Sequence, residues 1–162
     1  MAGASDDREV MLRFVERFAI VLAGTGMARM PARVFAYALI DDADRYTATD
    51  LAEALRVSPA AISTAVRDLV QAGLLGKQRE PGDRTDTYVL YGDDIWSEVY
   101  LNREGLMEPF ERIAAEGVEL IGRERPGGRR LAETQAFFAF MRKELPALME
   151  RWREYRHEAL QN

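Results

Sequence analysis

The side chains that usually carry out covalent and metal chemistry are scarce in this sequence. Cysteine is absent, and His157 is the single histidine. These counts exclude disulfides, thiolate nucleophiles, Cys/His zinc sites and any Ser-His-Asp triad that does not use His157. The sequence also shows no glycine-rich phosphate loop, no metal-ligand spacing and no nucleophile–base pair. We therefore expect no enzymatic activity, no catalytic residues, no bound metal and no cofactor.

Residues 59–71 offer a different chemistry, because this short segment is rich in small and hydroxylic residues. Read with helical periodicity, one side of it is apolar and carries Ile62, Val66, Leu69 and Val70. The other side carries small or polar residues, namely Pro59, Ala60, Ser63, Thr64, Arg67 and Gln71. Hydroxyls donate and accept hydrogen bonds, and a guanidinium donates several. This side of the helix can therefore form hydrogen bonds with a partner that approaches closely.

Capping signals place this segment in the second of two short helices that are separated by a tight turn. Thr47 and Asp50 fit a capping box that starts the first helix. That helix stops before Pro59, because the residue preceding a proline disfavours the helical region. Ser58 is a suitable N-cap and Pro59 a suitable first residue for the second helix, which Gly73 ends.

Two further helices precede this pair, and two strands follow it. Apolar residues at helical spacing predict the first helix, namely Met11, Phe14, Phe18 and Val21 or Leu22. Pro31 opens the second helix, and the acidic run 41–44 closes it. The strands are expected at 75–79 and 85–90, joined by a turn that contains Pro81 and Gly82. Because two strands are marginal alone, the hairpin must lean on the helices.

The last seventy or so residues read as helical. One long helix is expected from about Trp96 to Ile121, followed by a loop over 123–130. In the final helix, apolar residues alternate steps of three and four, the seam pattern of a helix that packs along another helix. They are Leu131, Thr134, Phe138, Met141, Leu145, Leu148, Trp152 and Tyr155. Since the seam keeps its phase across Pro146, we expect a kinked helix rather than a break there.

Length and composition limit the architecture and the partners. The chain has 162 residues, 48% of them apolar and 30% charged, as in a globular protein of one domain or a small domain plus an extension. No apolar run reaches the about 18–20 residues of a membrane span, and the N-terminus lacks a signal-peptide layout. We therefore expect a cytoplasmic protein with no membrane partner. The net charge is -5, so any nucleic-acid binding depends on where individual charges point.

Several short motifs between Tyr46 and Leu75 recur in one family of bacterial regulators. They are Leu51-Ala52, Val57-Ser58, Ile62-Ser63, Arg67-Asp68-Leu69 and Gly73-Leu74. With them, the segment resembles the core of the MarR family of winged helix-turn-helix regulators. The turn Gly82-Asp83-Arg84 followed by Tyr88, and the run 30–33, are closer to a GbsR-like branch. Helix order matches over nearly the whole chain, whereas motif-level similarity covers about residues 30–90.

The resemblance implies a fold and a domain plan. The fold is mainly α with a small β-hairpin wing, a winged helix-turn-helix domain flanked by N- and C-terminal dimerisation helices. Residues 1–8 are expected to form a flexible tail and 9–28 the N-terminal dimerisation helix. Residues 29–92 then form the DNA-binding domain and 93–162 the C-terminal helical dimerisation region.

In this reading, the helix after Ser58 contacts double-stranded DNA. Its small outward face can approach the floor of a major groove, which is about 12 Å wide, and its N-terminus favours a phosphate oxygen. We expect DNA contacts from Ser58, Pro59, Ala60, Ser63, Thr64 and Arg67 in the recognition helix, and from Lys77, Arg79 and Arg84 in the wing. Arg84, at the hairpin tip, is placed to enter a minor groove. Nearby acids, namely Asp68, Glu80, Asp83 and Asp86, would weaken binding.

A single winged domain contacts few base pairs, so we expect a homodimer that binds inverted half-sites. The expected dimer interface comprises Phe138, Met141, Leu145, Leu148 and Trp152. Aromatic residues of the terminal helices suggest a candidate ligand pocket formed by Phe14, Phe18, Trp96 and Tyr100. Such a pocket suits a small aromatic or cationic effector, which would act by shifting the population of binding-competent dimers.

We therefore expect a sequence-specific DNA-binding transcriptional regulator. It would act as a homodimeric repressor on an inverted-repeat operator and be released by a small-molecule ligand. The alternative is a winged-helix module that binds other proteins and not DNA, for which the acidic balance would be natural.

Overall fold

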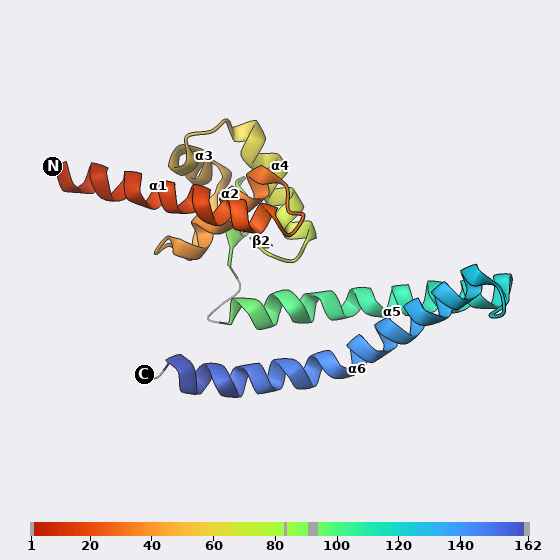
Figure 1. Cartoon of the computed structure of the whole chain (residues 1–162). Helices are drawn as coiled ribbons and strands as arrows, with labels where there is room; N and C mark the ends of the chain where they lie inside the picture. Colours follow the sequence, from red (N-terminus) through yellow and green to blue (C-terminus); the bar gives the residue numbers. More distant parts are fainter. Residues whose placement is uncertain (1, 83, 91–93, 161–162) are drawn as a thin grey trace. The chain divides into compact units, whose positions relative to one another are not determined.

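The structure is a computed structural model that describes the backbone of residues 2–82, 84–90 and 94–160. The side chains of 2–7, 98–104 and 106 lie outside the description. The chain divides into two compact units, Met1–Gly92 and Asp93–Asn162. The first unit holds α1 (Ala2–Ala23), α2 (Arg29–Ile40), β1 (Arg45–Thr47), α3 (Ala48–Leu55), α4 (Pro59–Gln71), β2 (Gly76–Gln78) and β3 (Thr87–Val89) (Figure 1). The second unit holds α5 (Ile95–Ile121) and α6 (Pro126–Leu160).

The expected mainly α fold with a small wing is confirmed, and local capping sets the central helices. The Thr47 hydroxyl accepts from the Asp50 amide, and the Asp50 carboxylate accepts from the Thr47 amide at 2.7 Å. Ser58 caps α4 by accepting from the Ala61 amide. Between the two helices, Arg56 adopts a left-handed conformation with φ 54°, so the chain reverses within three residues.

The core of the first unit forms where α4 packs on α2 and α3. From α4, it receives Ile62, Ala65, Val66 and Leu69, all buried. The opposing helices contribute Val34, Phe35 and Ala38 from α2 and Leu51 and Leu55 from α3. Burying an aliphatic or aromatic side chain of this size stabilises a fold by about 1.5–3 kcal/mol. The orientation of α4 about its own axis is therefore determined by this packing.

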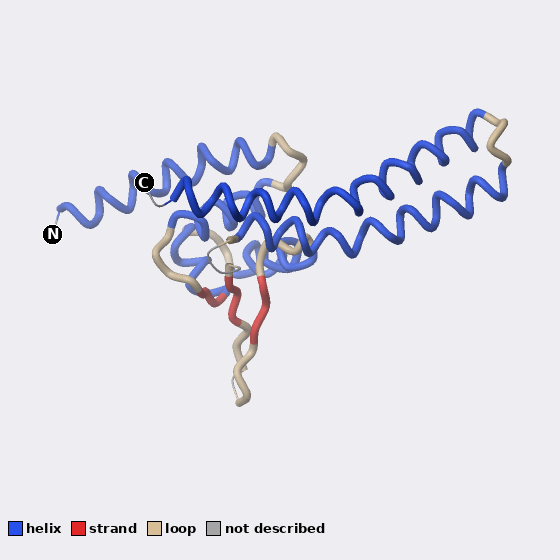
Figure 2. Tube along the Cα trace, turned by 90° about the horizontal axis from the view of Figure 1, so that it is seen from below, coloured by secondary structure: helices blue, strands red, loops and turns tan. Residues whose placement is uncertain are grey.

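The sheet has three strands in the order β1-β3-β2, one more than the sequence led us to expect. β3 pairs antiparallel with both neighbours, so Tyr88 lies opposite Tyr46 on one side and Lys77 on the other. The connection between β2 and β3 extends well beyond the paired strands (Figure 2). β1 was missed because it has only three residues and acquires its strand conformation from a partner 40 residues later in the chain.

An aspartate joins the end of α2 to the sheet. Asp41 accepts hydrogen bonds from the hydroxyls of Tyr37 at 3.0 Å and Tyr46 at 3.1 Å. Partial burial, together with this carboxylate, raises the pKa of Tyr37 to about 12 and that of Tyr46 still further. Both phenols therefore stay neutral donors at physiological pH and hold β1 against the helices.

α1 packs on α2 along one side and leaves apolar residues of its other side exposed. Val15 and Ala19 are buried, whereas Phe14 is 47% and Val21 66% exposed. Arg33 of α2 binds Glu16 of α1 at 2.6 Å and also donates to the Leu55 carbonyl, which links three helices. Residues 2–8, where we expected a flexible tail, belong to α1.

The second unit is an antiparallel pair of long helices, α5 and α6, joined by a short connection (Figure 2). The connection is shorter than the loop expected over 123–130, because α6 already begins at Pro126. Gly128 explains this early start: a Cβ there would lie 1.9 Å from the Gly122 carbonyl oxygen. Gly128 therefore lets the first turn of α6 lie close to the end of α5, and the glycines belong to the helix and not to a loop. α6 continues through Pro146 as one helix, as expected.

The predicted seam of α6 packs largely against α5. Phe138 stacks on Phe110 with ring centroids 4.7 Å apart, and Arg142 binds Glu111 at 3.0 Å. Leu145, also on this seam, is only 2% exposed. The heptad-like spacing thus identified a helix–helix contact correctly, and much of that contact is made inside the chain.

Asp94 closes the open end of the helix pair. It caps α5 through the Ser97 amide, accepts from the Trp152 indole nitrogen at 2.9 Å and lies 3.7 Å from Arg153. Partial burial by itself would raise the pKa of this carboxyl. The hydrogen bonds from Ser97 and Trp152 outweigh it and hold the pKa below the ordinary 3.8.

We predict that Asp94→Asn lowers the stability of the helix pair in a pH-dependent manner. A carboxylate whose folded-state pKa is depressed contributes stability above its unfolded pKa and loses it as pH falls through the folded value. The difference between wild type and variant should therefore be present at pH 7, begin to fall near the unfolded pKa of about 4, and disappear only below the lower folded-state pKa. Urea unfolding followed by circular dichroism across this range measures it, with exposed Glu150→Gln as the control. A difference that does not change with pH would contradict this role of Asp94.

Candidate nucleic-acid interface

In the first unit, the outward face of α4 is exposed to solvent. All six predicted recognition-helix residues are exposed, namely Ser58, Pro59, Ala60, Ser63, Thr64 and Arg67. None of them is needed for the apolar packing described above, which uses the opposite side of α4. The Arg67 guanidinium lies 3.5 Å from the Thr64 hydroxyl, at the outer limit of a hydrogen bond. The first two turns thus present only short side chains, and the third presents a long cation.

A hollow of about 390 Å³ lies between α4 and the strands of the wing. Its lining joins the two predicted halves of the interface: Ser63, Arg67, Val70 and Gln71 come from α4, and Lys77 and Tyr88 from the strands. Arg67 and Lys77 therefore border one hollow, as a surface that follows a sugar-phosphate strand requires.

Two of the predicted wing cations are held by one carboxylate. Lys77 Nζ lies 2.8 Å from Asp86 Oδ2, and Arg79 Nη2 lies 2.6 Å from Asp86 Oδ1. The hydrogen bond from Lys77, with that from Arg79, holds the pKa of Asp86 below its ordinary value. Asp86 therefore faces two of the predicted DNA-contacting cations, and Lys77, Arg79 and Asp86 together carry a net charge of +1.

Arg84 lies near the tip of the hairpin, just after the turn at Pro81 and Gly82. Gly82 has φ +98°, a conformation that a residue with a Cβ rarely adopts. The Arg84 side chain is exposed, and among the described residues no carboxylate forms an ion pair with it. Its neighbour Asp83 lies outside the described residues. Arg84 is thus a cation that can reach a groove beyond the body of the domain.

Sequence reasoning missed Arg56 and Tyr88. Arg56 is exposed in the turn before Ser58, and Tyr88 lines the hollow beside Lys77. The left-handed backbone of Arg56 directs a long cation outward beside the N-terminus of α4, where helix amides favour anions. The only signal in the sequence is a basic residue at a helix end where glycine is usual.

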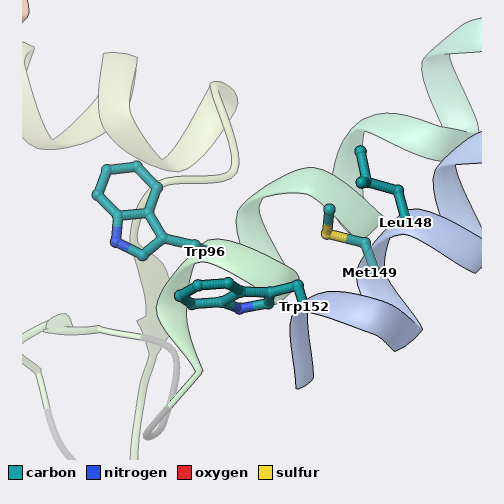
Figure 3. A pocket seen from close by; sticks show the side chains of 4 residues that line it. All are labelled: Trp96, Leu148, Met149 and Trp152. Atoms are coloured by element: carbon teal, nitrogen blue, oxygen red, sulfur yellow. The ribbon is translucent and has the colours of Figure 1, made fainter. Parts of the chain in front are cut away.

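The four residues of the candidate ligand pocket are divided between the two units. Phe14 and Phe18 of α1 have ring centroids 6.0 Å apart in the first unit. Trp96 belongs to the second unit, where it lines a cavity of about 450 Å³ with Leu148, Met149 and Trp152 (Figure 3). The side chain of Tyr100 lies outside the described residues. The second unit therefore has an aromatic cavity, but two of its walls come from residues we expected at the dimer interface.

The predicted dimer residues divide into two groups. Phe138 and Trp152 contact partners on or beside α5, Leu145 is buried and Met141 is half-buried. Leu148 is 47% exposed. Phe137 and Tyr155 are more exposed still and lie eleven and seven residues from Leu148, close to whole numbers of helical turns. An apolar strip of Phe137, Leu148 and Tyr155 thus lies along α6.

Two other kinds of site were sought in the described part of the chain. No three His, Cys, Asp or Glu side chains gather there in an arrangement that could hold a metal ion. No helix in those ranges combines the length and the apolar character needed to cross a bilayer.

A small-faced helix followed by a hairpin that carries Lys77, Arg79 and Arg84 is the arrangement of a winged helix-turn-helix domain. A family model described as MarR family matches residues 26–84, and one described as MmpR5-like MarR family transcriptional regulator matches residues 94–155. Both models describe MarR-family transcriptional regulators, and the residues they match together cover most of the chain. Within that family, the GbsR-like branch stays a prediction.

Two individual proteins are similar over most of the chain. HTH-type transcriptional regulator MmpR5 of Mycobacterium tuberculosis (strain ATCC 25618 / H37Rv) is 29% identical over 140 residues, which cover 86% of this chain and 82% of that protein. A crystal structure of a transcriptional regulator is 26% identical and has a TM-score of 0.76, covering 89% of this chain and 98% of the other. The similarity therefore extends through both units.

We predict that Arg84→Ala weakens operator binding about tenfold, equivalent to about 1.4 kcal/mol, without an appreciable change in melting temperature. The reason is that Arg84 is exposed and contributes to no packing within the described residues. Fluorescence anisotropy with a labelled duplex and thermal unfolding measure the two effects, with exposed Arg17→Ala in α1 as the matched control. A large loss of melting temperature would instead make Arg84 a structural residue.

Proposed function

We propose that this regulator is a repressor that binds an inverted-repeat operator as a homodimer, each copy contacting one half-site through α4 and the wing. The observation that carries the proposal is the exposed face of α4, where short side chains adjoin a hollow bordered by Arg67 and Lys77. Since bacterial DNA lies in the cytoplasm, the protein would act there.

Each part of this surface suits a different part of a duplex. Ser63 and Thr64 are short enough to let the helix backbone approach base edges, to which hydroxyls donate or accept. Arg67 reaches guanine or the phosphate backbone from the next turn. The N-terminus of α4 at Ser58 and Ala60 supplies amides for a phosphate, and Arg84 suits a narrow minor groove with strong negative potential.

Exposed apolar side chains on the long helices support the homodimer. The strip of Phe137, Leu148 and Tyr155 on α6 remains uncovered within the second unit, and α5 adds exposed Ile113 and Leu120. Large apolar surfaces on a soluble protein commonly mark an interface. Two copies related by a two-fold axis would pack this strip against the same strip of the partner copy, so that both strips are buried.

The cavity beside Trp96 and Trp152 supports release by a ligand. Its apolar and aromatic lining suits a small planar molecule, and aromatic faces also attract cations. A ligand that binds one arrangement of the dimer more tightly than another would change operator affinity only by that difference. Because Leu148 lines the cavity and also belongs to the apolar strip, binding there would be coupled to the dimer surface.

Mobility-shift titrations with the DNA upstream of the protein's own gene test the proposal. We expect a saturable shift at 50 mM salt that weakens by 200 mM, because each phosphate contact releases a condensed counterion. An unrelated duplex of equal length is the control. No shift at low salt would contradict DNA binding and favour a winged-helix module that binds other proteins.

We predict that Leu148→Glu converts the dimer to a monomer while keeping the helical content. The variant places a charge on the apolar strip but not in the core of the helix pair, because Leu148 is 47% exposed. Analytical ultracentrifugation and circular dichroism measure the two quantities. Lys143→Glu, an exposed position away from the strip, adds the same side chain and should remain a dimer. A wild-type chain that sediments as a monomer would refute the homodimer.

A further inference from the structure

The stem of the wing contains three charged side chains, Lys77, Arg79 and Asp86, whose mutual pairing the DNA-binding role does not by itself explain. Lys77 belongs to β2, and Arg79 and Asp86 follow and precede the paired residues Gln78 and Thr87. The next residues along the two antiparallel strands, Arg79 and Asp86, lie opposite one another and share a face of the hairpin. Side chains two residues apart on one strand also share a face, which places Lys77 with Arg79. Lys77, Arg79 and Asp86 therefore meet on one face of the hairpin.

Both oxygens of the Asp86 carboxylate are used by these cations. Oδ2 binds Lys77 Nζ at 2.8 Å, while Oδ1 binds Arg79 through Nη2 at 2.6 Å and Nε at 2.8 Å. The Asp86 side chain is only 21% exposed, whereas those of Lys77 and Arg79 are about half exposed. The carboxylate thus lies beneath two cations that face outward.

This arrangement changes what the cations can offer to a phosphate. A free lysine or arginine gains a phosphate contact and releases a condensed counterion. Lys77 and Arg79 must instead exchange an existing charge-assisted hydrogen bond for the new one, and a phosphate that enters also meets the negative charge of Asp86. The ordinary gain from a random phosphate contact is therefore largely offset at these two positions.

The other two cations of the surface differ in this respect. Among the described residues, no carboxylate is paired with Arg67 or Arg84, and both are exposed. They lie where contact depends on the groove, one on α4 and one at the wing tip. Cations that depend on groove geometry are thus unpaired, whereas the cations on the stem, which any backbone could reach, are paired.

We propose that Asp86 is a specificity-determining residue: by holding Lys77 and Arg79, it suppresses sequence-independent binding to the phosphate backbone. The inference rests on the proposed DNA-binding function of α4 and the wing. An operator complex is positioned by contacts from α4 and Arg84 and needs these two cations less than a complex on random sequence does. Because Asp86 lowers the affinity for random DNA more than the affinity for the operator, it increases the ratio of specific to non-specific affinity.

The test compares Asp86→Asn with wild type on two duplexes: an operator selected in vitro with the wild-type protein, and a scrambled duplex of the same length. We expect the variant to bind the scrambled duplex about five times more tightly and the operator less than about twice as tightly. The salt dependence on the scrambled duplex should steepen by about one counterion for each released cation, up to about two. Thermal unfolding confirms that both proteins are folded.

Two further variants separate this role from a general change of charge. Glu80→Gln removes one exposed negative charge from the same hairpin, at a residue for which the described structure shows no ion pair, and should change the affinity ratio much less. Lys77→Gln added to Asp86→Asn should reverse much of the gain on scrambled DNA.

The outcomes that overturn the inference are distinct from failure of the proposed function. Weaker binding of Asp86→Asn to both duplexes would mean that the carboxylate directs the cations toward phosphate. Equal gains on both duplexes, or an equal effect of Glu80→Gln, would reduce Asp86 to a general charge. If the wild-type protein binds neither the operator candidates nor scrambled DNA, the proposed function itself is wrong and this inference falls with it.

Discussion

The arrangement of the first unit depends on one requirement: α4 must bury its apolar side on α2 and α3. A helix of 13 residues is marginal alone in water, so it is stable because Ile62, Val66 and Leu69 leave solvent. Their burial leaves the helix a single orientation about its axis. The face with Ser63 and Thr64 is therefore presented outward as a consequence of core packing, with no separate interaction needed to hold it there.

Sequence reasoning succeeded where the signals are local. The caps at Thr47 and Ser58 act within three residues, so helix starts can be read without knowledge of the fold. β1 was missed because its conformation depends on a distant strand. The start of α6 was placed too late because the glycines near 127 were read as loop, whereas Gly128 permits a contact between two turns of backbone.

The candidate site shows the same division between local and distant information. The face of α4 follows from helical periodicity, and all of its predicted residues are exposed. Periodicity also found the seam of α6, yet it cannot identify the helix that packs against the seam, and for Phe138 that helix is α5. Ion pairs across the wing, such as Asp86 with Lys77, depend on strand register and were outside the reach of spacing arguments.

The overall charge of -5 is compatible with a DNA-facing surface because electrostatic effects on a protein surface are local. At physiological ionic strength, exposed charges are largely screened beyond about 8 Å, so acids elsewhere on the chain matter little to a phosphate at the wing. The nearby charges decide, and there Asp86 neutralises one of two adjacent cations. A surface with few unpaired cations binds any backbone weakly, so in the proposed function its affinity for an operator comes from groove contacts and from two copies acting together. With the role proposed for Asp86, the same charge balance that lowers affinity for random DNA raises selectivity.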